Sequence, residues 1–361
     1  MHILTVPEPL DPTFPGPFKP GEYLVEDRNG AEIMLMTPGA TMKESVLWCP
    51  ERNIHNLEQP PITRILIIAP LGFGDSILLT PCLRAIKQLH PSATLALAVL
   101  HERRQPFLGL PYVDGFEDYP LRTEHLSKYD CVLSLERSVE NNPKARVQHM
   151  TDRFAEHLGL AELKDRTVDY IVSQAELDWV KASFPRGKKR RIGVQVQAAA
   201  RCRSYPKMTL LIEALRREGW EVGLLGRPGE FRTDGPQNPD VIDLSRRGLT
   251  WRQSAAFLLT CDVFLGPDSS LLHAAGALNV PAVGLFGPFP WKLRTAYYKS
   301  VHAIQGHEGC DIAPCFHSQH LGMPPFPLNG PCIQTGKCHV LDSILPKRII
   351  AKIEQVAAKP I

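Results

Sequence analysis

The sequence predicts an α/β protein in which two Rossmann-like domains face a cleft. Short apolar runs, such as residues 65–69 and 282–286, have the composition of strands that are buried on both faces of a parallel sheet. Helical stretches separate these runs, and the alternation of strand and helix occurs in both halves of the chain. A chain of 361 residues is long enough for two domains that each bury a full core.

Charge, hydropathy and cysteine usage narrow the class of protein. The formal net charge of +3 is small for this length, which argues against a nucleic-acid partner. No apolar run approaches the roughly 18 to 20 residues that span a bilayer, and residues 1–30 lack the basic start and apolar core of a secretory signal. Nine cysteines spread over the chain indicate a reducing compartment rather than a disulfide framework. We therefore expect a cytoplasmic protein with at most peripheral membrane contact.

Residues 1–60 stand apart as a small N-terminal β-rich extension. Their first part is rich in proline, which is incompatible with a helix. Residues 23–25 and 33–36 have strand character and flank Asn29-Gly30, a pair that favours a tight hairpin turn. The segment is either a small β-appendage or an arm that packs on a neighbour, and no chemistry is assigned to it.

Residues 61–187 are expected to form the N-terminal domain. A strand at 65–69, a helix at 77–89 and a strand at 94–100 make a βαβ unit whose loop, PLGFGDS, holds Gly74 and Asp75. An aspartate at a helix start serves as a cap or as a general base, and this stretch alone leaves both readings open. The elements predicted after this unit are a strand at 131–135 and helices at 146–158 and 174–184.

Residues 188–345 repeat the alternation, and the basic run 186–191 leads into them as a domain linker. Such a run is usually solvated, although it also suits acidic surfaces such as lipid phosphates. A terminal helix is expected over 346–361, with Ile349 and Ile353 on one face. The predicted strands are 192–196, 222–225, 263–265, 282–286 and 301–304, and the predicted helices are 207–218, 251–260 and 271–278.

The stretch GPDSSLLHAAGALNVPAVGLFGP, residues 266–288, is the strongest candidate site. Asp268, Ser269 and Ser270 stand between a short apolar strand and a helix of small residues. The first N–H groups of a helix lack backbone partners and the helix dipole is positive there, so this turn suits an anion. An ordinary Asp/Ser helix cap explains the same residues equally well.

This stretch resembles the donor site of glycosyltransferase family 9, the ADP-heptose heptosyltransferases, whose usual D-T-G-L-x-H appears here as Asp-Ser-Ser-Leu-Leu-His. RILII…LGFGDS resembles the opening unit of the same family, and the resemblance covers about residues 64–345. It implies the GT-B architecture. It also implies Asp75 as the catalytic base, with donor contacts from Gly74, Arg203, Glu230, Asp268, Ser269, Ser270 and His273.

The resemblance further implies an inverting glycosyltransferase that needs no catalytic metal. The donor would be a nucleoside-diphosphate sugar, ADP-heptose in most of the family, and the acceptor a hydroxyl of a lipopolysaccharide core sugar or of a protein. Two alternatives stay open. One is a sugar-nucleotide 2-epimerase of the same architecture, and the other is a non-catalytic nucleotide-sugar-binding scaffold. The scaffold alternative is supported by serine in place of the family's threonine and glycine, and by the first 60 residues, which the resemblance does not cover.

Four of the nine cysteines fall in the irregular segment 307–339, namely Cys310, Cys315, Cys332 and Cys338. Four thiolates at such spacings suit a structural zinc or iron, and reduced thiols are the alternative. The autotransporter branch of the resembled family carries such a cluster, and some members hold iron in it. A homo-oligomer is left open.

Overall fold

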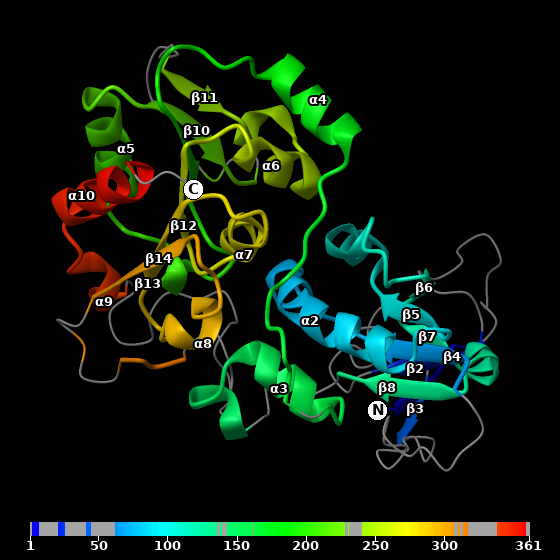
Figure 1. Cartoon of the computed structure of the whole chain (residues 1–361). Helices are drawn as coiled ribbons and strands as arrows, with labels where there is room; N and C mark the ends of the chain where they lie inside the picture. Colours follow the sequence, from blue (N-terminus) through cyan, green and yellow to red (C-terminus); the bar gives the residue numbers. More distant parts are fainter. Residues whose placement is uncertain are drawn as a thin grey trace.

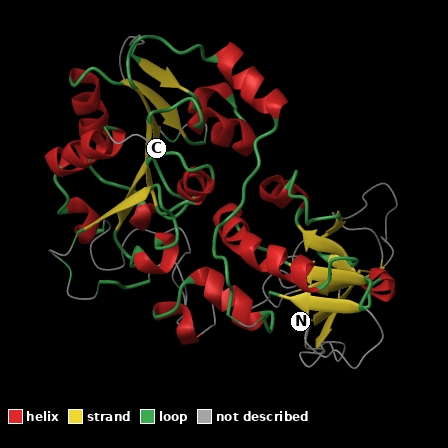
Figure 2. Cartoon of the chain, in the orientation of Figure 1, coloured by secondary structure: helices red, strands yellow, loops and turns green. Residues whose placement is uncertain are grey.

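A computed structural model of the chain shows two α/β halves, each built on a parallel sheet (Figure 1). The α/β class expected from the sequence is therefore confirmed. Helices and strands alternate in both halves, as the colouring by secondary structure shows (Figure 2). The structure describes residues 2–6, 21–25, 41–44, 62–135, 138, 143–160, 162–227, 230, 240–306, 310, 313–316 and 338–358. Within these residues no helix is both long and apolar enough to cross a membrane.

The N-terminal half holds a parallel sheet in the order β6-β5-β4-β8. Its central strand, β4, is buried on both faces because its side chains from Ile65 onward are all apolar. Helix α2 (Phe73–Leu89) packs on one face, and α3 (Met150–His157) packs on α2. The strands are β4 (Arg64–Ile68), β5 (Thr94–Val99), β6 (Gly115–Asp118) and β8 (Cys131–Ser134), and three 3₁₀ helices accompany them: η1 (His101–Phe107), η2 (Thr123–Lys128) and η3 (Pro143–Arg146).

The N-terminal extension packs on this half. Its strands β1 (His2–Val6), β2 (Gly21–Val25) and β3 (Thr41–Glu44) pair antiparallel, and β7 (Leu121–Arg122) of the N-terminal half completes the sheet beside β2. Of the two expected hairpin strands, 23–25 is confirmed, and it pairs with β1 and β7. The other, 33–36, and the turn at Asn29-Gly30 lie outside the described residues.

The C-terminal half holds a larger parallel sheet in the order β11-β10-β9-β12-β13-β14. Helices α5 and α10 cover one face, where they share an apolar cluster with the strands, and α6 and α7 cover the other. The strands are β9 (Arg191–Gln195), β10 (Glu221–Leu225), β11 (Val241–Asp243), β12 (Val263–Pro267), β13 (Ala282–Phe286) and β14 (Val301–Gln305). The helices are α5 (Met208–Arg217), α6 (Trp251–Leu258), α7 (Ser270–Ala277), α8 (Lys292–Thr295), α9 (His339–Asp342) and α10 (Pro346–Ala357), with 3₁₀ turns at η4 (Arg201–Arg203) and η5 (Ser245–Arg247).

Helix α4 (Gln174–Ser183) precedes the expected domain boundary but packs on α6 of the C-terminal half. The basic run that follows is held by acidic partners in that half. Arg186 pairs with Asp262, Lys189 with Asp240, and Arg190 with Glu354. Most of this run is therefore engaged within the protein, which reduces the charge it can offer to an anionic surface.

The two halves meet where the start of α2 crosses α7. A Cβ placed on Gly74 would lie 2.9 Å from Cδ2 of His273 and 3.5 Å from Cα of Ser270. Only glycine permits this approach without displacing its neighbours. The expected helix at 77–89 therefore starts earlier, at Phe73, so Gly74 and Asp75 lie in its first turn rather than in a loop. The expected helix at 146–158 is also shorter, because His149 caps a new start at Met150.

Candidate active site

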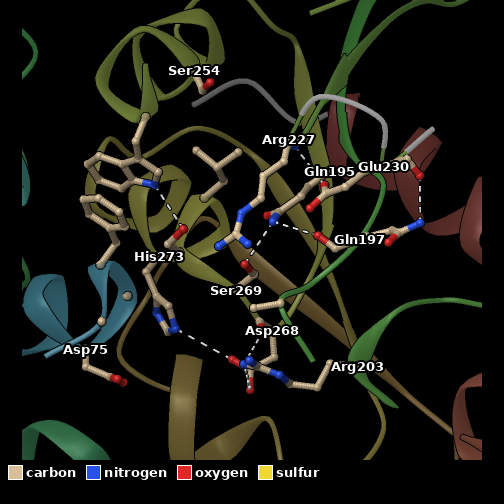
Figure 3. Close-up of a pocket in the computed structure, with 18 of the residues that line it drawn as sticks. Asp75, Gln195, Gln197, Arg203, Arg227, Glu230, Ser254, Asp268, Ser269 and His273 are labelled. Carbon is tan, nitrogen blue, oxygen red and sulfur yellow. Dashed lines mark hydrogen bonds and ion pairs between the residues drawn. The ribbon is translucent and has the colours of Figure 1, made fainter. Parts of the chain in front are cut away.

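A cavity of about 500 Å³ lies at this crossing, between the first turn of α2 and the carboxyl ends of strands in the C-terminal half. Open α/β sheets bind ligands at such strand ends. Figure 3 shows Asp75 at one end of the site and Glu230 at the other, with Ser269 between them. The structure brings all the expected non-cysteine site residues to this cavity: Gly74, Asp75, Arg203, Glu230, Asp268, Ser269, Ser270 and His273.

Among the described residues of the N-terminal half, Asp75 is the one carboxylate that lines the cavity. It is the third residue of α2, and the helix start at Gly72 has no side-chain cap. Within the described part of the chain, the Asp75 carboxylate makes no hydrogen bond or salt bridge. A capping aspartate would accept a backbone N–H, so this arrangement supports the base over the cap.

The start of α7 faces the cavity without a side-chain cap. Ser269 has an extended backbone (φ −157°, ψ 170°), and its hydroxyl accepts a 2.9 Å bond from Nε2 of Gln195 instead of capping the helix. The first helical bond runs from the N–H of Leu272 to the carbonyl of Ser269, at 3.0 Å. The preceding N–H groups, of Ser270 and Leu271, have no recorded partner in the described residues. Unpaired N–H groups and the positive end of a helix dipole suit an anion, which is the property that the sequence predicts for this turn.

Ser270 connects this helix start to an aromatic stack that joins the two halves. Its hydroxyl accepts a 3.0 Å bond from Nε1 of Trp251. The Trp251 ring stacks on Phe73 with 4.8 Å between centroids and 8° between planes. Arg103 covers the other face of Phe73 at 4.6 Å. Because Phe73 lies two residues before Asp75, this stack fixes the carboxylate's helix turn relative to the start of α7.

Asp268 is buried among positive groups beneath this helix start. The Oδ1 atom of Asp268 lies 3.7 Å from Nε2 of His273, while Oδ2 lies 3.9 Å from Nη1 of Arg203 and 3.8 Å from Nε of Arg294. Arg203 also donates a 2.8 Å bond to the Asp268 carbonyl. Burial by itself would raise the pKa of Asp268, but His273 and the two guanidinium groups lower it to about 2. The Asp268 carboxylate therefore stays charged at neutral pH.

Tyr298 and Asp268 together favour one tautomer of His273, because the carboxylate beside Nε2 can only accept a hydrogen bond. The Nδ1 atom of His273 lies 2.9 Å from the Tyr298 hydroxyl, and both residues are buried. Burial, with a smaller contribution from Asp268, raises the pKa of Tyr298 well above its usual value, so the phenol keeps its proton. When the O–H of Tyr298 donates to Nδ1, the ring proton lies on Nε2. The Nε2–H of His273 then faces Oδ1 of Asp268, and both residues line the cavity.

Glu230 lies at the opposite end, on the turn after β10. Its Oε2 accepts a 2.9 Å bond from the N–H of Arg227, and its carbonyl accepts a 2.7 Å bond from Nε2 of Gln197. The Arg227 side chain points from this turn toward Ser269 (Figure 3). This end therefore combines a carboxylate that accepts hydrogen bonds with an exposed cation near the start of α7.

Several residues that line the cavity were not identified from the sequence. Gln195 carries a weak signal, because it ends a buried strand where ligands collect. Arg227 stands in the Gly-Arg-Pro-Gly-Glu turn, next to a residue that was identified. The others carry no sequence signal, because only the fold brings them to the site: Phe73, Gln197, Trp251 and Arg294.

The expected cysteine site is described in part. Cys310 and Cys315 are half-buried and Cys338 is buried, whereas Cys332 lies outside the described residues. In the part of the chain that the structure describes, no three His, Cys, Asp or Glu side chains come close enough to hold a metal ion. The three described thiols therefore do not make a metal site by themselves.

Comparison with known proteins matches this chain to one family. The model of glycosyltransferase family 9 (heptosyltransferase) matches residues 126–322. This region includes the cavity residues from Gln195 to Arg294 but not Asp75. The lipopolysaccharide heptosyltransferase 3 of Escherichia coli is 30% identical over 146 residues, which cover 36% of this chain and 43% of that protein. The match thus spans less than half of this curated relative.

Solved structures share the fold at low sequence identity. ADP-heptose lipopolysaccharide heptosyltransferase II of E. coli has a TM-score of 0.61 and 17% identity, covering 82% of this chain and 98% of that chain. The iron-containing dodecameric glycosyltransferase TibC from enterotoxigenic E. coli has a TM-score of 0.60 and 13% identity, covering 82% and 76% respectively. The GT-B architecture expected from the sequence is therefore confirmed.

Proposed function

The chain belongs to glycosyltransferase family 9, and from that premise we propose that this glycosyltransferase moves heptose from ADP-heptose to an acceptor hydroxyl with inversion at the anomeric carbon. One observation carries the proposal. A carboxylate from one half faces an uncapped, cation-rich helix start from the other, across a cavity of about 500 Å³. That is the pairing of base and leaving-group site that direct displacement requires.

In the proposed reaction, Asp75 accepts the proton of the acceptor hydroxyl as that oxygen attacks the anomeric carbon. The bond between this carbon and the phosphate oxygen breaks, and its electron pair leaves with the nucleoside diphosphate. The N–H groups at the start of α7, the Nε2–H of His273 and the Arg203 guanidinium stabilise the departing charge. Every group in this step belongs to the chain itself, and we assign no catalytic metal.

The donor and acceptor are proposed from the relatives and from the ends of the cavity. Solved relatives include TibC in complex with ADP-D-β-D-heptose, and the curated relative is a lipopolysaccharide heptosyltransferase. Glu230 suits the ribose, because its carboxylate accepts hydrogen bonds at the strand end beyond the anion site. We propose a lipopolysaccharide core sugar as the acceptor, and a protein hydroxyl as the second candidate.

Calorimetric titration of the purified protein with ADP-, UDP- and GDP-sugars tests the donor. We expect ADP-heptose to bind most tightly, and transfer to a lipopolysaccharide core acceptor to release ADP. Tight donor binding without turnover on any acceptor would identify a scaffold instead. Equal affinity for all three nucleotides would contradict the assignment of adenine.

We propose further that the segment 307–339 holds a structural zinc or iron, which requires the Cys332 thiolate in addition to the three described thiols. Elemental analysis of protein purified without added metal should show about one metal per chain. Cys315→Ser should lower both metal content and melting temperature. Cys261 is a buried thiol outside this segment, so the control variant Cys261→Ala should keep the metal. Metal-free protein whose four thiols all react under native conditions would exclude the site.

A further inference from the structure

Arg294 is a buried cation on the floor of the cavity, and the reaction above does not use it. It belongs to the short helix α8, lines the cavity and is 8% exposed. Its neighbour on the same helix, Lys292, points to solvent. Of the two cations on α8, Arg294 therefore lines the cavity and Lys292 does not.

The contacts of the Arg294 guanidinium within the described residues are weak for a group with five N–H donors. Its Nη1 lies 3.4 Å from the Met150 sulfur, a poor acceptor. Its Nε lies 3.8 Å from Oδ2 of Asp268, which is beyond hydrogen-bond distance. The guanidinium also lies over the Phe289 ring, at 4.9 Å. A buried guanidinium held this loosely has donors available for a ligand.

The charges around Arg294 also call for an anion. One carboxylate, that of Asp268, faces Arg203, Arg294 and His273, and its Oδ2 has no hydrogen-bond partner in the described residues. Two guanidinium groups thus face one buried carboxylate, and a bound anion would balance the second positive charge.

The position of Arg294 indicates which part of the donor it meets. Its Nη1 contacts Met150 on α3, so it faces the N-terminal half, where Asp75 lies. Glu230, the proposed ribose contact, lies at the far end of the site (Figure 3). A nucleoside diphosphate sugar that extends from Glu230 toward Asp75 places its second phosphate, the one bonded to the sugar, nearest to Arg294.

We propose that Arg294, together with Arg203, binds the sugar-bearing phosphate of the donor and stabilises it as it departs. This inference rests on the proposed function and adds a residue to its leaving-group site. The phosphate oxygen that gives up the sugar gains the electron pair of the broken bond. A guanidinium donates two parallel N–H bonds to such an oxygen pair, which a point charge cannot do.

The test is calorimetry with ADP, AMP and adenosine on the wild-type protein and on Arg294→Gln. The variant should bind ADP about 10- to 150-fold more weakly, the range for a hydrogen bond to a charged group. AMP should lose less than about threefold and adenosine nothing, because neither carries the second phosphate. The ADP affinity of Arg294→Lys should lie between those of the wild type and Arg294→Gln, because lysine keeps the charge but not the two parallel N–H donors.

Lys292→Gln removes the same charge from the same helix and should bind all three ligands as the wild type does. Cooperative thermal unfolding of each variant excludes a folding defect, and Arg294→Lys carries the test if Arg294→Gln does not fold. Equal losses for ADP and AMP, or unchanged ADP affinity, overturn the proposal, and the latter points to an anionic group on the acceptor. Wild-type protein that binds ADP no better than adenosine would instead refute the proposed nucleotide site.

Discussion

Replacing Asp75 with Asn should lower kcat by about 10²- to 10⁴-fold while ADP affinity stays unchanged. Asparagine keeps the shape of the side chain but has no basic oxygen to accept the acceptor's proton. Donor affinity should not change, because Asp75 lies at the end of the site opposite Glu230, where the acceptor hydroxyl is proposed to bind (Figure 3). Steady-state kinetics with ADP release, alongside ADP titration, separates the two quantities.

Two further variants sharpen the assignment of Asp75. Asp75→Glu keeps a basic oxygen but moves it by one methylene, so its activity should lie between those of the wild type and Asp75→Asn. Asp178→Asn changes an exposed aspartate on α4, away from the cavity, and should be fully active. Near-normal turnover of Asp75→Asn would return Asp75 to a structural role at the helix start.

Most strands of the two parallel sheets were predictable, because a strand buried on both faces needs a continuous apolar run. The edge strands β6 and β11 were missed, because they are short and largely half-buried and so carry no such run. The start of α2 was not predictable from local signals. Gly72 and Gly74 indicate a loop by propensity, yet the helix begins at Phe73 because contact with α7 outweighs the cost of glycine. That contact joins residues about 200 positions apart, which no window of sequence contains.

The residues of the candidate site also divide into those that a local sequence pattern indicates and those that only the fold brings together. Asp268 to Ser270 and Asp75 were found because each lies at a strand-to-helix turn with a recognisable pattern. Arg294 and Trp251 were missed because their contacts are with residues distant in the sequence. Arg294 faces Asp268. Trp251 stacks on Phe73 and donates a hydrogen bond to Ser270. An arginine in an irregular segment and a tryptophan at a helix start look ordinary until the fold places them.

Replacing Asp268 with Asn should lower the free energy of unfolding by about 2 to 5 kcal/mol. The lower figure follows from the pKa of Asp268, which falls from 3.8 to about 2 on folding. The upper figure is typical of removing one partner from a buried ion pair. Both express the same cause, because the guanidinium groups of Arg203 and Arg294 would face a neutral amide instead of a carboxylate. Urea denaturation at neutral pH measures the loss.

The pH dependence separates charge from packing at Asp268. Its pKa is lower in the folded state, so its contribution is fully present above about pH 4 and is lost as the pH falls toward 2. The stability difference between wild type and Asp268→Asn should therefore narrow across that interval. Asp118→Asn is the control, because that side chain is 76% exposed in its pair with Arg104 and should cost no more than about 1 kcal/mol. A difference that stays constant from pH 6 to pH 2 would mean that Asp268 stabilises the fold by shape rather than by charge.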